Sequence, residues 1–155
     1  IHGCLVGSEM CIRDRLSAYG LAFHRHNSEI DQELKIKTGK KVKFQFTPHL
    51  SPMFRGILTT MYLDLKRNDS LKKIYSFLKK YYKNHKFIKI LKPNTFLGTN
   101  EVINTNNCYI SVCESKYKNK IIILSAIDNL IKGGSGQAVQ NMNILFGYNS
   151  DEGLS

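Results

Sequence analysis

Two histidines spaced two residues apart are the side chains of this sequence best suited to acid–base chemistry. They are His24 and His26, in the segment LAFHRHNSEI that spans residues 21–30. An imidazole titrates near neutral pH, so it can take up a proton and return it within one reaction cycle. In an extended strand both rings would point to one face and Arg25 to the other. We therefore expect an acid–base pair here. The alternative, two ordinary surface or half-buried histidines, stays open.

A third histidine, His49, lies in a loop between Pro48 and Pro52, and Arg55 follows it. The prolines restrict the backbone and so hold the position of this histidine at little entropic cost. A His-x-His strand joined by a third histidine can also bind zinc. We expect no metal at these residues, and we keep a three-histidine zinc site as an alternative.

A glycine-rich turn, GGSG at residues 133–136, lies between an apolar segment at 121–127 and a helical pattern at 137–146. The order of strand, glycines and helix is typical of phosphate cradles, in which backbone N–H groups face an anion. Neither a Walker lysine nor a complete GxGxxG motif is present. The pattern therefore also fits a tight turn without a ligand.

Hydrophobic periodicity predicts the elements that must position these residues. Strands are expected over 16–23, 42–46, 57–65, 87–91, 108–113 and 121–127, and helices over 28–37, 71–82 and 137–146. We expect Asn27 or Ser28 to cap the first helix and Gly39 to end it. The strand at 121–127 is apolar on both faces, which places it in the middle of the core, with the strand at 108–113 at the edge.

The composition fits one domain in a reducing compartment. The chain has 155 residues and four cysteines without a CxxC pair, so a cytoplasmic protein without disulfides is expected. No segment predicts a signal peptide or a membrane span. The formal charge is +11, and residues 69–92 hold eight lysines and one acid. We expect a solvated helix face and no nucleic-acid partner. A stand-alone basic nucleic-acid-binding module remains an alternative.

Residues 1–15, IHGCLVGSEMCIRDR, differ in composition from the rest of the chain. They contain no lysine, tyrosine, phenylalanine or asparagine, all of which are abundant afterwards. The stretch GSEMCIRDR resembles a translated sequencing adapter. We therefore expect residues 1–15 to be non-native, Cys4 and Cys11 to carry no function, and the natural sequence to begin near Leu16.

Three segments together resemble a known family. They are HRHNSEIDQEL from His24, FTPHLSPMFRGIL from Phe46 and AIDNLIKGGSGQAVQNMNILFG from Ala126. Their order and spacing resemble the C-terminal part of the N-acetyl-gamma-glutamyl-phosphate reductase family, within the glyceraldehyde-phosphate and aspartate-semialdehyde dehydrogenase group. The resemblance runs from about residue 16 to residue 154.

The resemblance implies an α+β fold, a largely antiparallel sheet flanked by helices like the C-terminal domain of glyceraldehyde-phosphate dehydrogenase. Residues 16–131 would form the catalytic and dimerisation domain. Residues 132–155 would form the helix that returns to an NADP-binding Rossmann domain, and that domain is missing from this sequence. The full-length protein would be a homo-oligomer without nucleic-acid or membrane partners.

The reaction implied by the resemblance is the NADPH-dependent reduction of N-acetylglutamyl 5-phosphate to N-acetylglutamate 5-semialdehyde and phosphate, in arginine biosynthesis. The family's nucleophilic cysteine lies in an Asn-Pro-Gly-Cys motif ahead of the region present here. We expect this chain to lack the nucleophile and to be inactive alone.

The resemblance also assigns roles to residues. His26 would be the acid–base partner with His24 beside it. Residues around the substrate would be Tyr19, Arg25, His49 and Arg55, the last as an anion contact, because a guanidinium pairs with carboxylate or phosphate. NADP would be contacted by Asn129, Lys132, Gly133, Gly134 and Gln137. Ser28 stands where the family usually has proline, and we expect this departure to affect stability slightly.

Overall fold

The structure is a computed structural model that describes residues 15–155. Its contacts divide the chain into two compact units, residues 1–54 and residues 55–155. The segment predicted to be non-native lies outside the described residues except for Arg15. No helix within residues 15–155 is both long and apolar enough to cross a membrane.

The described part of the first unit, residues 15–54, contains one helix and one short pair of strands. The helix α2 (His26–Thr38) ends as predicted at Gly39, whose φ of 67° is left-handed and whose N–H donates to Lys35 O at 2.8 Å. Strands β1 (Ser17–Ala18) and β2 (His49–Leu50) pair antiparallel, with Ser17 opposite Leu50 and Ala18 opposite His49. This pairing brings the start of the described chain beside the proline-flanked loop.

Two strand predictions in this unit are wrong. Only Ser17–Ala18 of the expected strand at 16–23 is extended in a ladder, because the chain turns at Gly20 and Ala22, both with positive φ. Residues 42–46 alternate as a strand would, but no described segment pairs with them. Alternation sets which side chains share a face, whereas a strand also needs a hydrogen-bonding partner.

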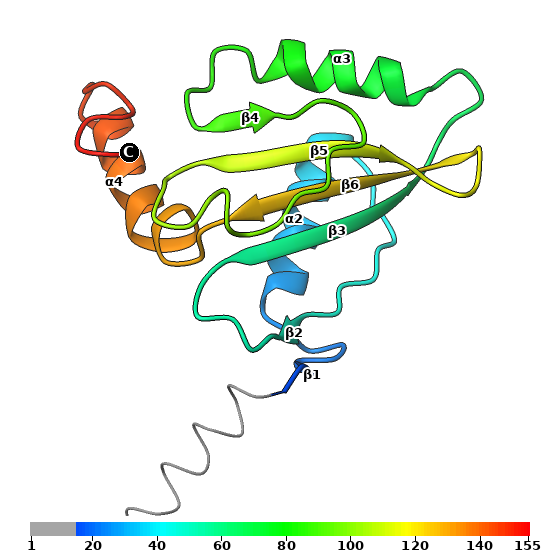
Figure 1. Ribbon diagram of the computed structural model, residues 1–155, viewed down its shortest axis with the longest axis horizontal. Helices are drawn as coiled ribbons and strands as arrows, with labels where there is room; N and C mark the ends of the chain where they lie inside the picture. The colour runs from blue at the N-terminus through cyan, green and yellow to red at the C-terminus, as the bar shows by residue number, and fades with distance from the viewer. Residues whose placement is uncertain (1–14) are drawn as a thin grey trace, which may run out of the picture. The chain divides into compact units, whose positions relative to one another are not determined.

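The second unit is built on a mixed sheet of four strands, which Figure 1 shows side by side. Their order is β3 (Ile57–Asp64), β6 (Lys120–Ile127), β5 (Cys108–Glu114) and β4 (Ile88–Ile90). The first three are antiparallel neighbours, and β4 is parallel to β5. The α+β class is therefore confirmed. The strand β5 is an inner strand of the sheet, because β4 extends the sheet beyond it.

The core lies on β5 and β6. Leu97, Val102 and Ala126 form a buried cluster, against which Leu91, Tyr109 and Leu124 pack. Val112 of β5 and Ile121 of β6 are also buried. They point to the opposite face of the sheet from Tyr109 and Ala126, because side chains alternate along a strand, so both faces of this part of the sheet are covered. Every residue of β3, by contrast, is exposed.

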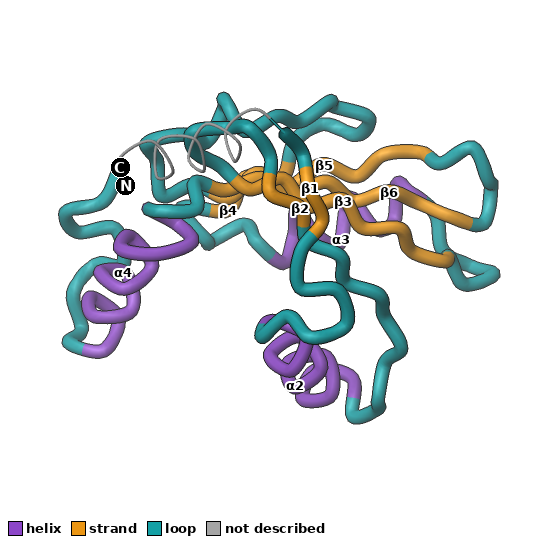
Figure 2. Tube along the Cα trace, turned by 90° about the horizontal axis from the view of Figure 1, so that it is seen from below, coloured by secondary structure: helices purple, strands orange, loops and turns teal. Residues whose placement is uncertain are grey.

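Two helices complete the second unit. The helix α3 (Leu71–Tyr81) begins where Ser70 accepts a hydrogen bond from the N–H of Lys73 at 3.3 Å, and it packs on β4 and β5. A π-helical turn (Ile131–Ser135) leads from β6 into α4 (Gly136–Leu145), which Figure 2 shows beyond one end of the sheet. The stripe of Ala138, Met142 and Leu145 is exposed, and Gly136 and Asn143 are the buried residues of α4.

Truncating Val102 tests the position of the core. This side chain is fully buried, so we expect Val102→Ala to lower the free energy of unfolding by about 2–3 kcal/mol through lost burial and a residual cavity. Urea unfolding measures the loss, provided that the dependence of the unfolding free energy on urea concentration is the same in both proteins. Leu145→Ala, at a position that is 79% exposed, is the matched control and should change stability by less than about 0.5 kcal/mol. Equal losses in the two variants would contradict this assignment of the core.

Candidate functional site

The two histidines of the HRH segment lie together with two other aromatic rings. The ring centroids of His24 and His26 are 4.7 Å apart, and the ring of His24 lies 5.3 Å from Tyr19 and 5.4 Å from Phe46, all in edge-on arrangements. Both histidines are half-buried. The two imidazoles therefore lie close together in a partly shielded aromatic environment. The sequence predicted that both rings would share one face of a strand, whereas a turn brings them together here.

The backbone around Gly20 brings His24 into this cluster. Phe23 N–H donates to Gly20 O at 3.3 Å, and Gly20 has a φ of +59°. A Cβ on Gly20 would lie 2.9 Å from Cδ2 of His24, which is closer than van der Waals contact allows. Glycine at this position thus allows both the turn and the close approach of the ring.

A hydrogen bond fixes the orientation of His24. Its Nδ1 accepts the backbone N–H of His26 at 3.2 Å, so in the neutral ring the proton is assigned to Nε2. The predicted caps Asn27 and Ser28 do not cap α2: Arg25 is the N-cap residue, and Ser28 Oγ donates to Arg25 O at 2.8 Å. The imidazole of His24 binds the first N–H group of α2 instead.

The other predicted residues of this unit lie outside the ring cluster. Within residues 15–54, His49 is exposed on β2 and Arg25 is exposed before α2, and neither makes a ring contact with the pair. The described residues contain no group of three or more His, Cys, Asp or Glu side chains that could hold a metal ion. The three-histidine zinc alternative therefore has no support in the described chain.

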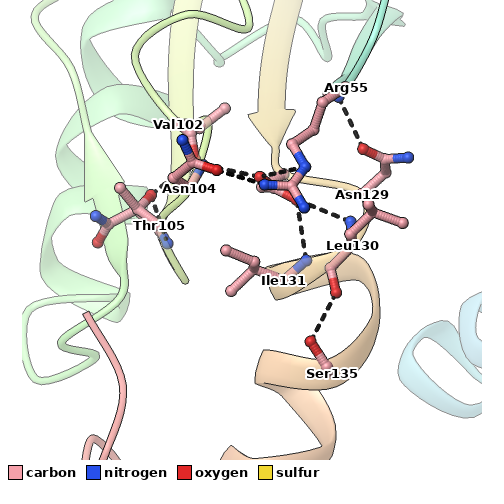
Figure 3. A network of polar contacts seen from close by, with 11 residues as sticks. Arg55, Val102, Asn104, Thr105, Asn129, Leu130, Ile131 and Ser135 are labelled. Atoms are coloured by element: carbon pink, nitrogen blue, oxygen red, sulfur yellow. Dashed lines mark hydrogen bonds and ion pairs between the residues drawn. The ribbon is translucent and has the colours of Figure 1, made fainter.

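The second unit contains a buried carboxylate at the end of β6. Asp128 is fully buried, and its Oδ1 accepts the N–H groups of Leu130 at 2.8 Å and Ile131 at 2.9 Å. Its Oδ2 accepts the N–H of Asn104 at 2.8 Å and lies 3.4 Å from Nε of Arg55. Figure 3 shows the guanidinium beside Asn104, with the backbone of Leu130 and Ile131 facing the same place.

These contacts keep Asp128 ionised. Burial alone raises the pKa of Asp128, but hydrogen bonds from the N–H groups of Asn104, Ile131 and Leu130, together with the charge of Arg55, outweigh it, so the pKa lies below the ordinary aspartate value. The carboxylate is therefore negative at neutral pH and balances the guanidinium.

Arg55 is engaged within the chain. Besides the ion pair with Asp128, its Nη1 donates to Oδ1 of Asn104, and the side chain is 20% exposed. The next residue, Gly56, donates its N–H to Oδ1 of Asn129 at 2.8 Å. The role of Arg55 as a substrate contact stays a prediction, because its charge already has a partner in this structure.

Backbone N–H groups of the glycine-rich turn also have hydrogen-bond acceptors within the chain. The N–H groups of Gly133 and Ser135 donate to Asp128 O and Leu130 O, each at 2.9 Å, and the N–H of Gly136 donates to Ile131 O. These three amides are not available to a phosphate. In this conformation the N–H groups of Gly133, Ser135 and Gly136 therefore do not form a phosphate cradle.

Two side chains of the predicted cofactor segment also have partners in α4. Nζ of Lys132 donates to Oε1 of Gln140 at 2.7 Å, and Nε2 of Gln137 donates to Oδ1 of Asn141 at 2.8 Å. Contacts from Asn129, Lys132, Gly133, Gly134 and Gln137 to NADP stay predictions for the longer protein.

Sequence reasoning missed Asp128 as the centre of this region. An Asp-Asn pair directly after an apolar strand is a turn signal, because these side chains bind nearby backbone N–H groups, and it could have indicated Asp128. No local signal could have indicated Asn104 or Arg55 as its partners, because both come from distant parts of the sequence.

Replacing the buried carboxylate tests this network. We expect Asp128→Asn to lower the free energy of unfolding at neutral pH by about 3–5 kcal/mol, because it leaves Arg55 without a countercharge. The folded pKa of Asp128 lies below the unfolded value of about 3.9. Its stabilisation is therefore present above that pH and is lost as the pH falls through the folded pKa. Urea unfolding between about pH 7 and pH 2 should show the difference from wild type shrinking in acid.

An exposed ion pair provides the control. Asp64 pairs with Lys120 on the surface, and its side chain is 75% exposed. Asp64→Asn should cost less than about 1 kcal/mol. If Asp64→Asn lowered the free energy of unfolding as much as Asp128→Asn, burial of Asp128 would not explain its contribution to stability.

Solved structures share the fold. The chain superposes on an aspartate semialdehyde dehydrogenase from Francisella tularensis with a TM-score of 0.64 at 14% identity, covering 84% of this chain and 39% of that one. Aspartate semialdehyde dehydrogenase II from Vibrio cholerae gives 0.62 at 14% identity, covering 79% and 36%. At such low identity the similarity concerns the fold alone.

Relatives with named activities are closer in sequence. An N-acetyl-gamma-glutamyl-phosphate reductase from Thermoanaerobacter pseudethanolicus is 48% identical over 141 residues, 91% of this chain and 41% of that protein. A protein of the same name from Campylobacter jejuni subsp. doylei is 46% identical over 143 residues, 92% and 42%. The chain thus spans about two fifths of the length of these relatives.

A family model covers most of the chain. The semialdehyde dehydrogenase dimerisation domain matches residues 7–129, a range that includes the ring cluster, Arg55 and Asp128. Because the match extends over more than half of the sequence, the chain belongs to the semialdehyde dehydrogenase dimerisation-domain family.

Proposed function

We propose that this chain is the C-terminal part of an N-acetyl-gamma-glutamyl-phosphate reductase. The observation that carries the proposal is the 48% identity over 91% of the chain to a protein of that name. The full-length protein would use NADPH to reduce N-acetylglutamyl 5-phosphate to N-acetylglutamate 5-semialdehyde and phosphate, for arginine biosynthesis in the cytoplasm.

The histidine pair would handle the proton of the reaction. A thiol must lose its proton before it can attack an acyl phosphate, and a nearby imidazole can hold that proton and return it. His26 is the proposed acid–base residue. His24, whose Nδ1 already accepts the N–H of His26, would hold its ring beside His26 and present Nε2–H. The aromatic contacts to Tyr19 and Phe46 would limit the motion of these rings.

The nucleophile would come from the part of the protein that precedes this chain. Cys108 and Cys113 both lie in β5. Sγ of Cys108 lies 3.5 Å from Oγ of Ser125, and Sγ of Cys113 lies 3.8 Å from Thr95 O. Both thiols make contacts within the second unit, which supports a structural role. The chain alone would therefore be inactive, as the resemblance implied.

Substrate and cofactor contacts remain part of this proposal. Tyr19, Arg25, His49 and Arg55 would surround the substrate, and residues of the 129–137 segment would approach NADP in the full-length protein. A guanidinium suits a substrate that carries both a carboxylate and a phosphate. For Arg55 this role requires a rearrangement, because its present partner is Asp128.

Reconstitution with the missing half tests the proposal. We expect residues 16–155, joined to the N-terminal half of the Thermoanaerobacter relative, to reduce N-acetylglutamyl phosphate, followed by loss of NADPH absorbance. His26→Ala should lower kcat by about 100-fold to 10,000-fold, because general acid–base catalysis contributes this much. His24→Ala should also lower it. Gln32→Ala, at an exposed position of α2, should leave it unchanged. A folded chimaera without activity would refute these roles. So would an active chimaera whose kcat is unchanged by both His24→Ala and His26→Ala.

We also propose that the full-length protein is a homo-oligomer and that β3 contributes to the contact. The matched family is described as a dimerisation domain. The strand β3 lies at the edge of the sheet and exposes large apolar side chains, among them Leu58 at 45% and Tyr62 at 71%. These two residues point to the same face of the sheet. Apolar groups gathered on a surface indicate a protein contact.

Charges on this face should prevent assembly. We expect Leu58→Glu with Tyr62→Glu to reduce the sedimentation mass of the full-length chimaera to that of a monomer, because carboxylates would be buried without partners. Tyr117→Glu, in the exposed turn between β5 and β6, is the matched control and should leave the mass unchanged. A wild-type chimaera that sediments as a monomer, or an unchanged double variant, would contradict the proposed contact.

A further inference from the structure

Two adjoining hollows lie where the end of α3 meets β4 and α4. The larger, of about 360 Å³, runs beside α3 and β4, and the smaller, of about 190 Å³, lies between the loop before β4 and α4. They share His85, Lys86 and Ile88 as lining residues. The two hollows therefore adjoin at these residues, and together we call them the α3–β4 corner.

The α3–β4 corner is strongly cationic. Lys79, Lys83, Lys86 and Lys89 line the larger hollow and Lys132 lines the smaller, and no described aspartate or glutamate lines either. Lys86 is paired with Asp151 at 2.6 Å, whereas no ion pair joins the other four lysines to a described carboxylate. Like charges around a concave surface repel each other and concentrate anions from solution.

Lys132 is the most confined of these cations. Its Nζ donates to the amide oxygen of Gln140 at 2.7 Å and lies 5.4 Å from the ring centroid of Phe87. Burial lowers the pKa of Lys132 below the ordinary lysine value. Both of its partners are neutral, so the charge is partly removed from water without a countercharge. An anion in the smaller hollow would supply that countercharge.

We propose that the α3–β4 corner binds a ligand with several consecutive phosphate groups. One phosphate in the smaller hollow could neutralise Lys132, and further phosphates of the same chain would face the exposed lysines of the adjoining larger hollow. A linear phosphate chain places charges at short, regular intervals, and ammonium groups bind phosphate as point charges. The proposal does not depend on the reductase activity. Of its residues only Lys132 is also a predicted NADP contact, and the other lysines belong neither to the histidine cluster nor to the predicted substrate or cofactor residues.

Calorimetric titration of the 155-residue chain with sodium tripolyphosphate tests the proposal. We expect saturable binding that Lys83→Gln with Lys89→Gln weakens about tenfold or more, since phosphate contacts dominate affinity for polyanions. Both lysines are exposed, so the variant should fold. Lys35→Gln with Lys37→Gln removes the same charge from the exposed end of α2 and should weaken binding less than about twofold.

Titrations with inorganic phosphate and with ATP identify which part of the ligand is bound. Inorganic phosphate should bind at least about tenfold more weakly than tripolyphosphate, because it meets fewer of the lysines. ATP that binds more tightly than tripolyphosphate would indicate a nucleotide as the source of the phosphates, and equal affinity would indicate the phosphate chain alone. Both results support the site. In ¹³C NMR of lysine side chains, bound tripolyphosphate should raise the pKa of Lys132.

Several results would overturn the inference. They are the absence of saturable binding, equal weakening by the two double variants, and an unchanged pKa of Lys132 on binding. A single-stranded RNA that binds more tightly than tripolyphosphate and keeps its affinity in Lys83→Gln with Lys89→Gln would also overturn it, because the polyanion would then bind elsewhere.

Discussion

The buried carboxylate of Asp128 is the contact on which the second unit depends. A negative charge without access to water is tolerated only when donors and a countercharge surround it. Here these come from the start of β3, from the loop before β5 and from the turn after β6, through Arg55, Asn104 and the N–H groups of Leu130 and Ile131. Removing any one segment would leave a buried charge unsatisfied, so the three segments are fixed together.

Hydrogen bonding within the chain also explains the conformation of the glycine-rich turn. A glycine-rich strand-to-helix turn can aim its N–H groups at a phosphate or at carbonyls of its own chain, and composition does not distinguish the two. In this chain the carbonyls of Asp128, Leu130 and Ile131 accept them. Packing also requires glycine at position 136, because a Cβ there would lie 2.5 Å from Oδ1 of Asn106.

Periodic segments were predictable and non-local contacts were not. The helix α3 and the strands β3, β5 and β6 agree with the sequence because the apolar spacing that predicts each of them lies within the segment itself. The strands expected at 16–23 and 42–46 failed because pairing depends on a partner that the local pattern does not reveal. For His24 and His26 the sequence predicted neighbouring rings, yet the neighbourhood comes from a turn at Gly20 and a hydrogen bond between the two residues.

The contacts also rank the residues that the family resemblance singled out. If Arg55 were to bind substrate it would exchange a buried carboxylate for an incoming anion, and Asp128 would keep its charge with fewer partners. That exchange costs free energy that the substrate would have to supply. Neither imidazole of the HRH segment forms an ion pair with a described carboxylate, and Nε2 of His24 is not used by its bond to His26. The proposed proton transfer by the histidine pair would therefore need less rearrangement than the proposed anion binding by Arg55.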